Sequence, residues 1–275
     1  MQGRLLPKYK GRYQAHPVGY WQREFHLAAD LSLDMIEFIL DYNDPDKNPL
    51  MSESGIEEIR QLSANTGVAV KTICADYFME APLHGSCGSV TEQSQKVLIK
   101  LIGNASKIGI CDIVIPCVDK GRLTDGKACN LFNKNIKPAL EQAEKFGLNL
   151  ALETDLAPGP FTDLLDKLYS PRVTVNYDTG NSASLGYDPA EELAAYGDRI
   201  SDIHIKDRLR AGGSVVLGTG ATDFERFFSA LAKTNYSGPF IMQAYRDDEG
   251  VKIFEKQLAW IKPKIEAWSE KMDVG

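Results

Sequence analysis

The chain has 275 residues, of which 43% are hydrophobic and 25% are charged, so it can bury one large core and has the composition of a globular protein. Its formal net charge of -7 argues against a broad nucleic-acid-binding surface, which needs clustered lysine and arginine. Its apolar runs are only strand-length, and its polar, basic N-terminus lacks the apolar core of a signal peptide. We therefore expect neither a membrane span nor a secretory leader.

Short apolar runs alternate with helix-like segments along the whole chain, which is the pattern of βαβ units around a parallel sheet. The expected strands are 35–40, 68–74, 112–118, 148–153, 173–178, 199–206 and 239–244, with a short eighth strand from MQGRL at 1–5. Eight such units in a chain of this length predict an α/β protein with one (β/α)8 TIM-barrel domain spanning 1–275.

Helical patterns fill the intervals between these strands. A helix over 52–67 should begin with a Ser52 cap and end at Gly67. Further helices are expected over 89–109, 130–147 and 223–235, and Pro138 should kink or restart the second of these. The segment 251–268 is expected to be a final capping helix.

The five cysteines do not form a recognisable framework. Their number is odd, their spacing is irregular and no CxxC pair occurs, which argues against structural zinc and against disulfides. Reduced thiols in the cytoplasm fit this pattern best. The cysteines are Cys74, Cys87, Cys111, Cys117 and Cys129.

Four polar residues end four successive apolar runs: Glu153, Asp178, His204 and Gln243. The intervals between them, 25, 26 and 39 residues, each fit one strand and one helix. In every run most of the large apolar residues share one face of the strand and these residues lie on the other. We therefore expect all four to point into the barrel at the carboxyl ends of its strands, where catalytic groups collect. Such ligands suit a divalent metal: Mn, Mg, Zn or Co.

Each of these residues also has a structural interpretation. Asp178 precedes the turn-rich DTGNS and could cap the next helix. His204 taken alone would suit a hydrogen-bonded core histidine. Gln243 is equally suited to a structural hydrogen bond, and its amide cannot accept a proton at neutral pH.

The segments NYDTGN, DIHIKD, LGTGATDF and FIMQAYR resemble the sugar phosphate isomerase/epimerase family, whose members have a xylose isomerase-like barrel. The resemblance covers nearly the whole chain and is most specific over 148–246. It implies a divalent cation held by Glu, Asp, His and Glu, at the positions of Glu153, Asp178, His204 and Gln243. Epimerase members use their two glutamates as an acid–base pair on opposite faces of the substrate, so Gln243 departs from that pattern.

A site of this kind removes a proton from the carbon beside a carbonyl group, and we expect Glu153 to accept that proton. An epimerisation needs a second group to return a proton from the other face. Glu37 has inward parity on the 35–40 strand and is the candidate, with an ion pair to Lys71 as the alternative. Asp207 and Tyr245 are weaker candidates.

Charged residues gather near the ends of the last two strands, and we expect some of them to bind substrate. Arg246 follows the last strand directly and is the preferred ligand for a phosphate or carboxylate group. The full set of expected substrate-binding residues is Lys206, Asp207, Arg208 and Arg246.

The sequence thus predicts a cytoplasmic, metal-dependent isomerase or epimerase of a ketose or ketose phosphate, which acts through a metal-stabilised enediolate. A metal-dependent dehydratase of a sugar or inosose and a non-catalytic sugar-binding barrel are the alternatives. An endonuclease is disfavoured by the acidic balance and by the presence of only four histidines. The expected partner is a small sugar, without nucleic acid or membrane, and the resemblance also allows a homo-oligomer.

Overall fold

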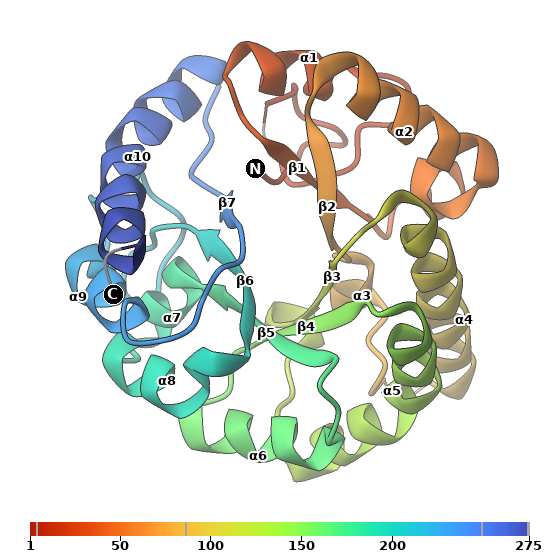
Figure 1. Ribbon diagram of the computed structural model, residues 1–275. Coiled ribbons are helices and arrows are strands. Elements are labelled where there is room, and N and C mark those ends of the chain that lie inside the picture. Colours follow the sequence, from red (N-terminus) through yellow and green to blue (C-terminus); the bar gives the residue numbers. More distant parts are fainter. Residues whose placement is uncertain (4, 86, 249, 274–275) are drawn as a thin grey trace.

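Parallel strands in sequence order form one curved sheet around a common axis, with the helices outside it (Figure 1). This computed structural model describes residues 1–3, 5–85, 87–248 and 250–273. Within them, seven of the expected strands are confirmed, and each end lies within two residues of its expected position. They are β1 (Met35–Ile39), β2 (Ala69–Cys74), β3 (Asp112–Cys117), β4 (Asn149–Thr154), β5 (Val173–Asp178), β6 (Ile200–Ile205) and β7 (Phe240–Met242).

The expected first strand at 1–5 is reduced to a single bridge between Gln2 and Glu37, and it lies between β7 and β1. The amide of Gln2 donates to the carbonyl of Met242 (3.1 Å), and Met1 O accepts from the amide of Glu37 (2.7 Å). Gly3 has a φ of 44°, which ends the extended conformation after two residues. Arg4, which belongs to the expected strand, lies outside the described residues.

The helices follow the strands in the order that a barrel requires. Ser52 caps the amide of Gly55 and Gly67 ends the same helix at a φ of 75°, as expected. The helix expected over 130–147 begins at Gly126, four residues earlier, because Asp125 caps the amide of Ala128. This helix continues through Pro138. The helices are α1 (Arg23–Asp30), α2 (Glu53–Thr66), α3 (Tyr77–Glu80), α4 (Gly88–Ala105), α5 (Gly126–Phe146), α6 (Pro158–Leu168), α7 (Thr179–Leu185), α8 (Pro189–Tyr196), α9 (Phe224–Leu231) and α10 (Val251–Asp273).

Side chains on the two faces of the sheet have different surroundings. Leu150 and Leu152 belong to the large outer core between strands and helices, whereas Ala151 belongs to a separate small cluster with Cys74 and Val114. Tyr177 packs outward, with its ring stacked on Phe227 at 5.4 Å between centroids. Several of the inward-facing side chains are polar, and these need hydrogen-bond partners inside the barrel.

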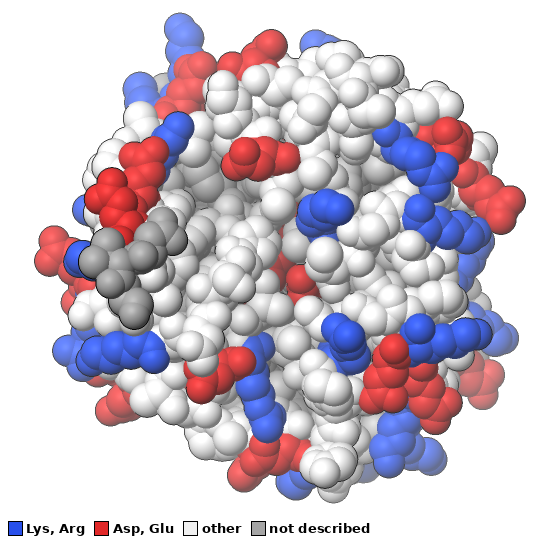
Figure 2. Space-filling view, in the orientation of Figure 1, with Lys and Arg blue, Asp and Glu red and all other residues white. Residues whose placement is uncertain are grey.

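Figure 2 shows acidic and basic side chains interspersed on the face in view, without a continuous basic area. Among the described residues, no helix is both long enough and apolar enough to span a bilayer.

Candidate active site

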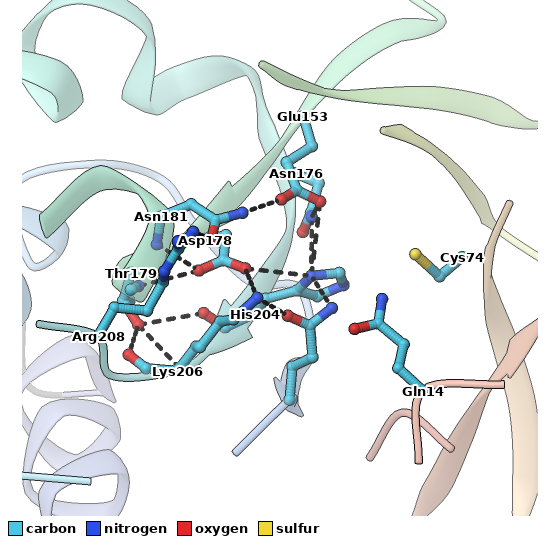
Figure 3. Close-up of polar contacts among 12 residues, drawn as sticks. Gln14, Cys74, Glu153, Asn176, Asp178, Thr179, Asn181, His204, Lys206 and Arg208 are labelled. Carbon is cyan, nitrogen blue, oxygen red and sulfur yellow. Dashed lines mark hydrogen bonds and ion pairs between the residues drawn. The ribbon is translucent and has the colours of Figure 1, made fainter. Parts of the chain in front are cut away.

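The four strand-end residues lie together inside the barrel (Figure 3 shows three of them labelled). Glu153 lies on β4, Asp178 ends β5, His204 lies on β6, and Gln243 directly follows β7. All four are buried, none with more than 5% of its surface exposed. The Nδ1 atom of His204 lies 3.8 Å from a carboxylate oxygen of Glu153 and 4.0 Å from one of Asp178.

Asp178 caps α7 with one carboxylate oxygen and faces other strand-end residues with the second. Its Oδ1 atom accepts hydrogen bonds from the amides of Gly180 (2.9 Å) and Asn181 (2.8 Å) at the start of α7. These bonds fix the carboxylate plane, so Oδ2 is directed toward His204 and Lys206. The helix cap therefore orients the group that faces the site.

Two asparagines hold the carboxylate of Glu153. Asn181 donates to Oε1 at 2.5 Å, and Asn176 donates to Oε2 at 3.1 Å. Burial, together with the negative charge of Asp178, raises the pKa of Glu153 to about 7. A carboxyl group with such a pKa can exchange a proton near neutral pH.

The protonation of His204 follows from its two partners. Its Nε2 atom lies 2.8 Å from Oε1 of Glu37, and because a carboxylate can only accept, Nε2 carries the proton. The side-chain amide of Asn176 approaches Nδ1 at 3.1 Å and can donate to it. Glu37 therefore holds the imidazole with the lone pair of Nδ1 toward Glu153 and Asp178.

Glu37 lies behind the imidazole and does not make the alternative ion pair with Lys71. Its side chain is fully buried, whereas Lys71 is exposed and donates to the carbonyl of Gly109 (3.4 Å). The side chain of Glu37 thus points into the barrel, as its strand position predicted, but it contacts His204. This position suits a residue that orients the imidazole.

Lys206 lies among the four strand-end residues, although its sequence position suggested a substrate anion as its partner. Its Nζ atom is 2.5 Å from Oε1 of Gln243 and 3.3 Å from Oδ2 of Asp178. Its side chain is only 11% exposed. The ammonium group therefore lies between the side chains of Gln243 and Asp178.

The other three expected substrate-binding residues have different surroundings. Arg208 donates to Oδ1 of Asn181 (2.8 Å) and so supports a residue that holds Glu153. Asp207 is fully buried, and its oxygens accept from the amides of residues 218, 220 and 222. The guanidinium of Arg246 lies over the ring of Tyr13, 4.8 Å from its centroid.

Arg246 is the member of this set with unused donors. Its Nε and Nη1 atoms are buried and have no hydrogen-bond partner among the described residues. Burial lowers the pKa of Arg246 from its ordinary value, which leaves a guanidinium that gains by pairing with an anion. The expectation that Arg246 binds a phosphate or carboxylate thus remains a proposal.

Asn176 and Asn181 contact the site, although they were not among the expected site residues. Asn176 has the same strand parity as Asp178, so the alternation that identified Asp178 could also have identified it. Asn181 comes three residues after Asp178, in the first turn of α7. Its direction depends on how that helix leaves β5, which the sequence does not show.

The donor set fits a divalent cation. Glu153, Asp178 and His204 each offer one ligand atom, and these atoms all lie within 4.8 Å of one another. Carboxylate oxygens and an unprotonated imidazole nitrogen are common ligands of zinc, while carboxylates also bind magnesium. Gln243 can add only a neutral carbonyl oxygen, and that oxygen accepts from Lys206.

Comparisons with known proteins give the family. Residues 25–264 match the model described as xylose isomerase-like TIM barrel. The chain is 26% identical over 267 residues to the L-ribulose-5-phosphate 3-epimerase UlaE of Salmonella heidelberg. The aligned region covers 92% of this chain and 93% of the relative. The chain belongs to the xylose isomerase-like TIM barrel family.

Two solved structures show the same fold. The 3-keto-D-glucoside 4-epimerase of E. coli has a TM-score of 0.72 and 17% identity, with 88% of this chain and 94% of that chain covered. A xylose isomerase-like barrel protein from Mycobacterium smegmatis, in complex with magnesium, has a TM-score of 0.69 and 19% identity, with coverages of 93% and 90%.

The contacts of Asp207 predict a role in stability. Replacing Asp207 with alanine leaves three loop amides without their shared acceptor, so we expect the free energy of unfolding to fall by about 2–4 kcal/mol. Urea denaturation measures this, with the exposed Asp163→Ala as the control that stays within about 0.5 kcal/mol of wild type. Wild-type stability combined with a raised KM would instead assign Asp207 to substrate binding.

Proposed function

We propose that the chain is a divalent-metal-dependent epimerase of a ketose or ketose phosphate. The observation that carries this proposal is the convergence of Glu153, Asp178 and the Nδ1 atom of His204 within 4.8 Å at the ends of β4 to β6. The family and the epimerases among the relatives support the reaction class. Isomerisation between neighbouring carbons of the same sugar uses the same first step.

Each residue of the site then has a defined task. A bound divalent cation would supply Lewis-acid stabilisation for the negative charge that develops on the substrate oxygens. Glu153, held by two asparagines, accepts the proton from the carbon beside the carbonyl. Glu37 fixes the neutral imidazole of His204 in the tautomer that carries its proton on Nε2, and burial of the whole group excludes bulk water from the developing charge.

The reaction itself can be tested with a panel of sugars in deuterated water. The protein, loaded with Mn²⁺ or Mg²⁺, is incubated with L-ribulose 5-phosphate and with other ketopentoses and ketohexoses, free and phosphorylated. An epimerase incorporates deuterium at one carbon and forms the epimer, both seen by NMR. A product lighter by one water would assign a dehydratase, and no label in any sugar would refute the proposal.

Glu153→Gln tests the proposed base. The amide keeps the size of the side chain but cannot accept a proton, so we expect the rate of epimer formation to fall by about 10²–10⁴-fold. The matched control is Glu141→Gln on the exposed face of α5, which should leave the rate unchanged. Near-normal turnover of Glu153→Gln would remove Glu153 from the mechanism.

Glu37→Gln tests the proposed orientation of His204. Loss of the negative charge behind the imidazole should weaken Mn²⁺ binding by about 10–100-fold, measured by titration calorimetry without substrate. Glu24 is also a buried glutamate, but it accepts from the amide of Leu5 (3.2 Å), so Glu24→Gln should bind Mn²⁺ like wild type. Equal affinities for the two variants would contradict the orienting role.

Arg246→Met tests whether the substrate carries a phosphate. The unpaired guanidinium nitrogens should bind an anionic group, so the variant should raise KM for a phosphorylated ketose by about tenfold or more. KM for the corresponding free sugar should change little. Arg60→Met, which removes an exposed arginine of α2 paired with Glu57, is the control, and equal effects on both sugars would exclude a phosphate contact.

A further inference from the structure

A buried carboxylate on the helical side of the sheet lies close to the candidate site without belonging to it. Glu192 is in the first turn of α8, and only 3% of its surface is exposed. A carboxylate withdrawn from water is costly unless other groups compensate its charge. The groups that compensate it here show which elements Glu192 connects.

Three hydroxyl groups converge on this carboxylate. Tyr177 of β5 donates to Oε2 at 2.9 Å, and Ser182 of α7 donates to the same oxygen. Tyr196, one turn further along α8, donates to Oε1 at 2.9 Å. Glu192 therefore ties β5 and α7 to α8, whereas its bond to Tyr196 stays within α8.

We propose that Glu192 is a positioning residue that holds the candidate metal site in shape from outside the barrel lumen. This inference rests on the divalent cation of the proposed function. The observation behind it is that Glu192 bonds to Tyr177 and Ser182, and that each of these two residues is a direct chain neighbour of residues in the site.

On β5, the alternation of side chains connects the two faces of the sheet. Tyr177 points outward, where its ring stacks on Phe227, so its neighbours Asn176 and Asp178 point inward. Asn176 donates to Glu153 at 3.1 Å, and Asp178 is one of the possible metal ligands. A bond that fixes the hydroxyl end of Tyr177 therefore limits the movement of both inward-facing side chains.

On α7, the connection runs through one peptide bond. Ser182 directly follows Asn181, whose side-chain amide donates to Oε1 of Glu153 at 2.5 Å. A helix of seven residues has little stability of its own, so its position depends on contacts with its surroundings. The bond from Ser182 to Glu192 is one of these contacts, and it acts beside Asn181.

A small cavity shows how close Glu192 is to the site. The cavity measures about 20 Å³, and both Glu153 and Glu192 line it, together with Asn181 and Ser182. Such a volume accommodates no more than one water molecule, so Glu192 lies close behind Glu153. Without the carboxylate of Glu192, α7 can shift into the vacated space and turn Asn181 away from Glu153.

The partners of Glu192 provide matched variants. Tyr177→Phe combined with Ser182→Ala removes the donors on β5 and α7 and leaves Glu192 in place. We expect this double variant to bind Mn²⁺ about threefold to tenfold more weakly than wild type, which is less than the roughly 10–100-fold typical of a residue that touches a metal ligand. Tyr196→Phe removes the donor within α8, so it should bind Mn²⁺ like wild type.

Substitution of Glu192 itself tests the same connection from the other side. Glu192→Met keeps the length of the side chain but offers no oxygen to the hydroxyls, so Mn²⁺ affinity should again fall by about threefold to tenfold. Glu192→Gln keeps one carbonyl acceptor and should recover most of that affinity. All affinities are measured by titration calorimetry without substrate, on protein that circular dichroism shows to be folded.

Loss of stability alone must not reproduce this effect. Asn104→Ala removes a buried hydrogen bond to the carbonyl of Leu50 (2.9 Å), and it leaves β5 and α7 untouched. We expect its urea midpoint to fall, because a buried acceptor loses its donor, while its Mn²⁺ affinity stays at the wild-type value.

Two results would overturn the proposal. One is wild-type Mn²⁺ affinity in both Glu192→Met and the double variant, and the other is an equal loss of affinity in Tyr196→Phe or Asn104→Ala. If Glu192→Met does not fold, the double variant and Tyr196→Phe decide the outcome. A wild type that binds no Mn²⁺ would instead refute the divalent site of the proposed function, so the two proposals fail on different measurements.

Discussion

The burial of several charged groups in one small volume is the constraint on which the site depends. Glu37, Glu153 and Asp178 are carboxylates withdrawn from water, and each would be costly to bury without a partner. Each has one: His204 for Glu37, two asparagine amides for Glu153, and the start of α7 with Lys206 for Asp178. Ligand atoms of Glu153, Asp178 and His204 still face a common space. The same contacts therefore compensate the buried charges and hold these ligand atoms in place.

The first turn of α7 links several of these contacts. Asp178 caps it, Asn181 on it holds Glu153, and Thr179 and Gly180 seat Lys206. Because the turn is fixed by the cap, its three functional contacts cannot vary independently. This explains how a turn-rich DTGN segment contributes to the geometry of the candidate site.

The pairing of Lys206 with Gln243 changes how a departure from the family pattern is interpreted. An amide in place of a carboxylate could indicate a decayed site. Here the amide oxygen accepts from a buried ammonium group, so the position retains a polar function without a negative charge.

The sequence by itself determined the strands, their order and the residues at their ends. Alternation of side chains across a strand is a local property, so it placed Glu153, Asp178 and His204 on the inner face without any tertiary information. Contacts between residues that lie far apart in the chain were determined only by the tertiary structure. Glu37 and His204 are 167 residues apart, and their contact requires a barrel that brings β1 and β6 around the same axis. The direction of the Lys206 side chain toward Gln243 likewise depends on the space that Gly180 leaves, which a pattern of residue types cannot specify.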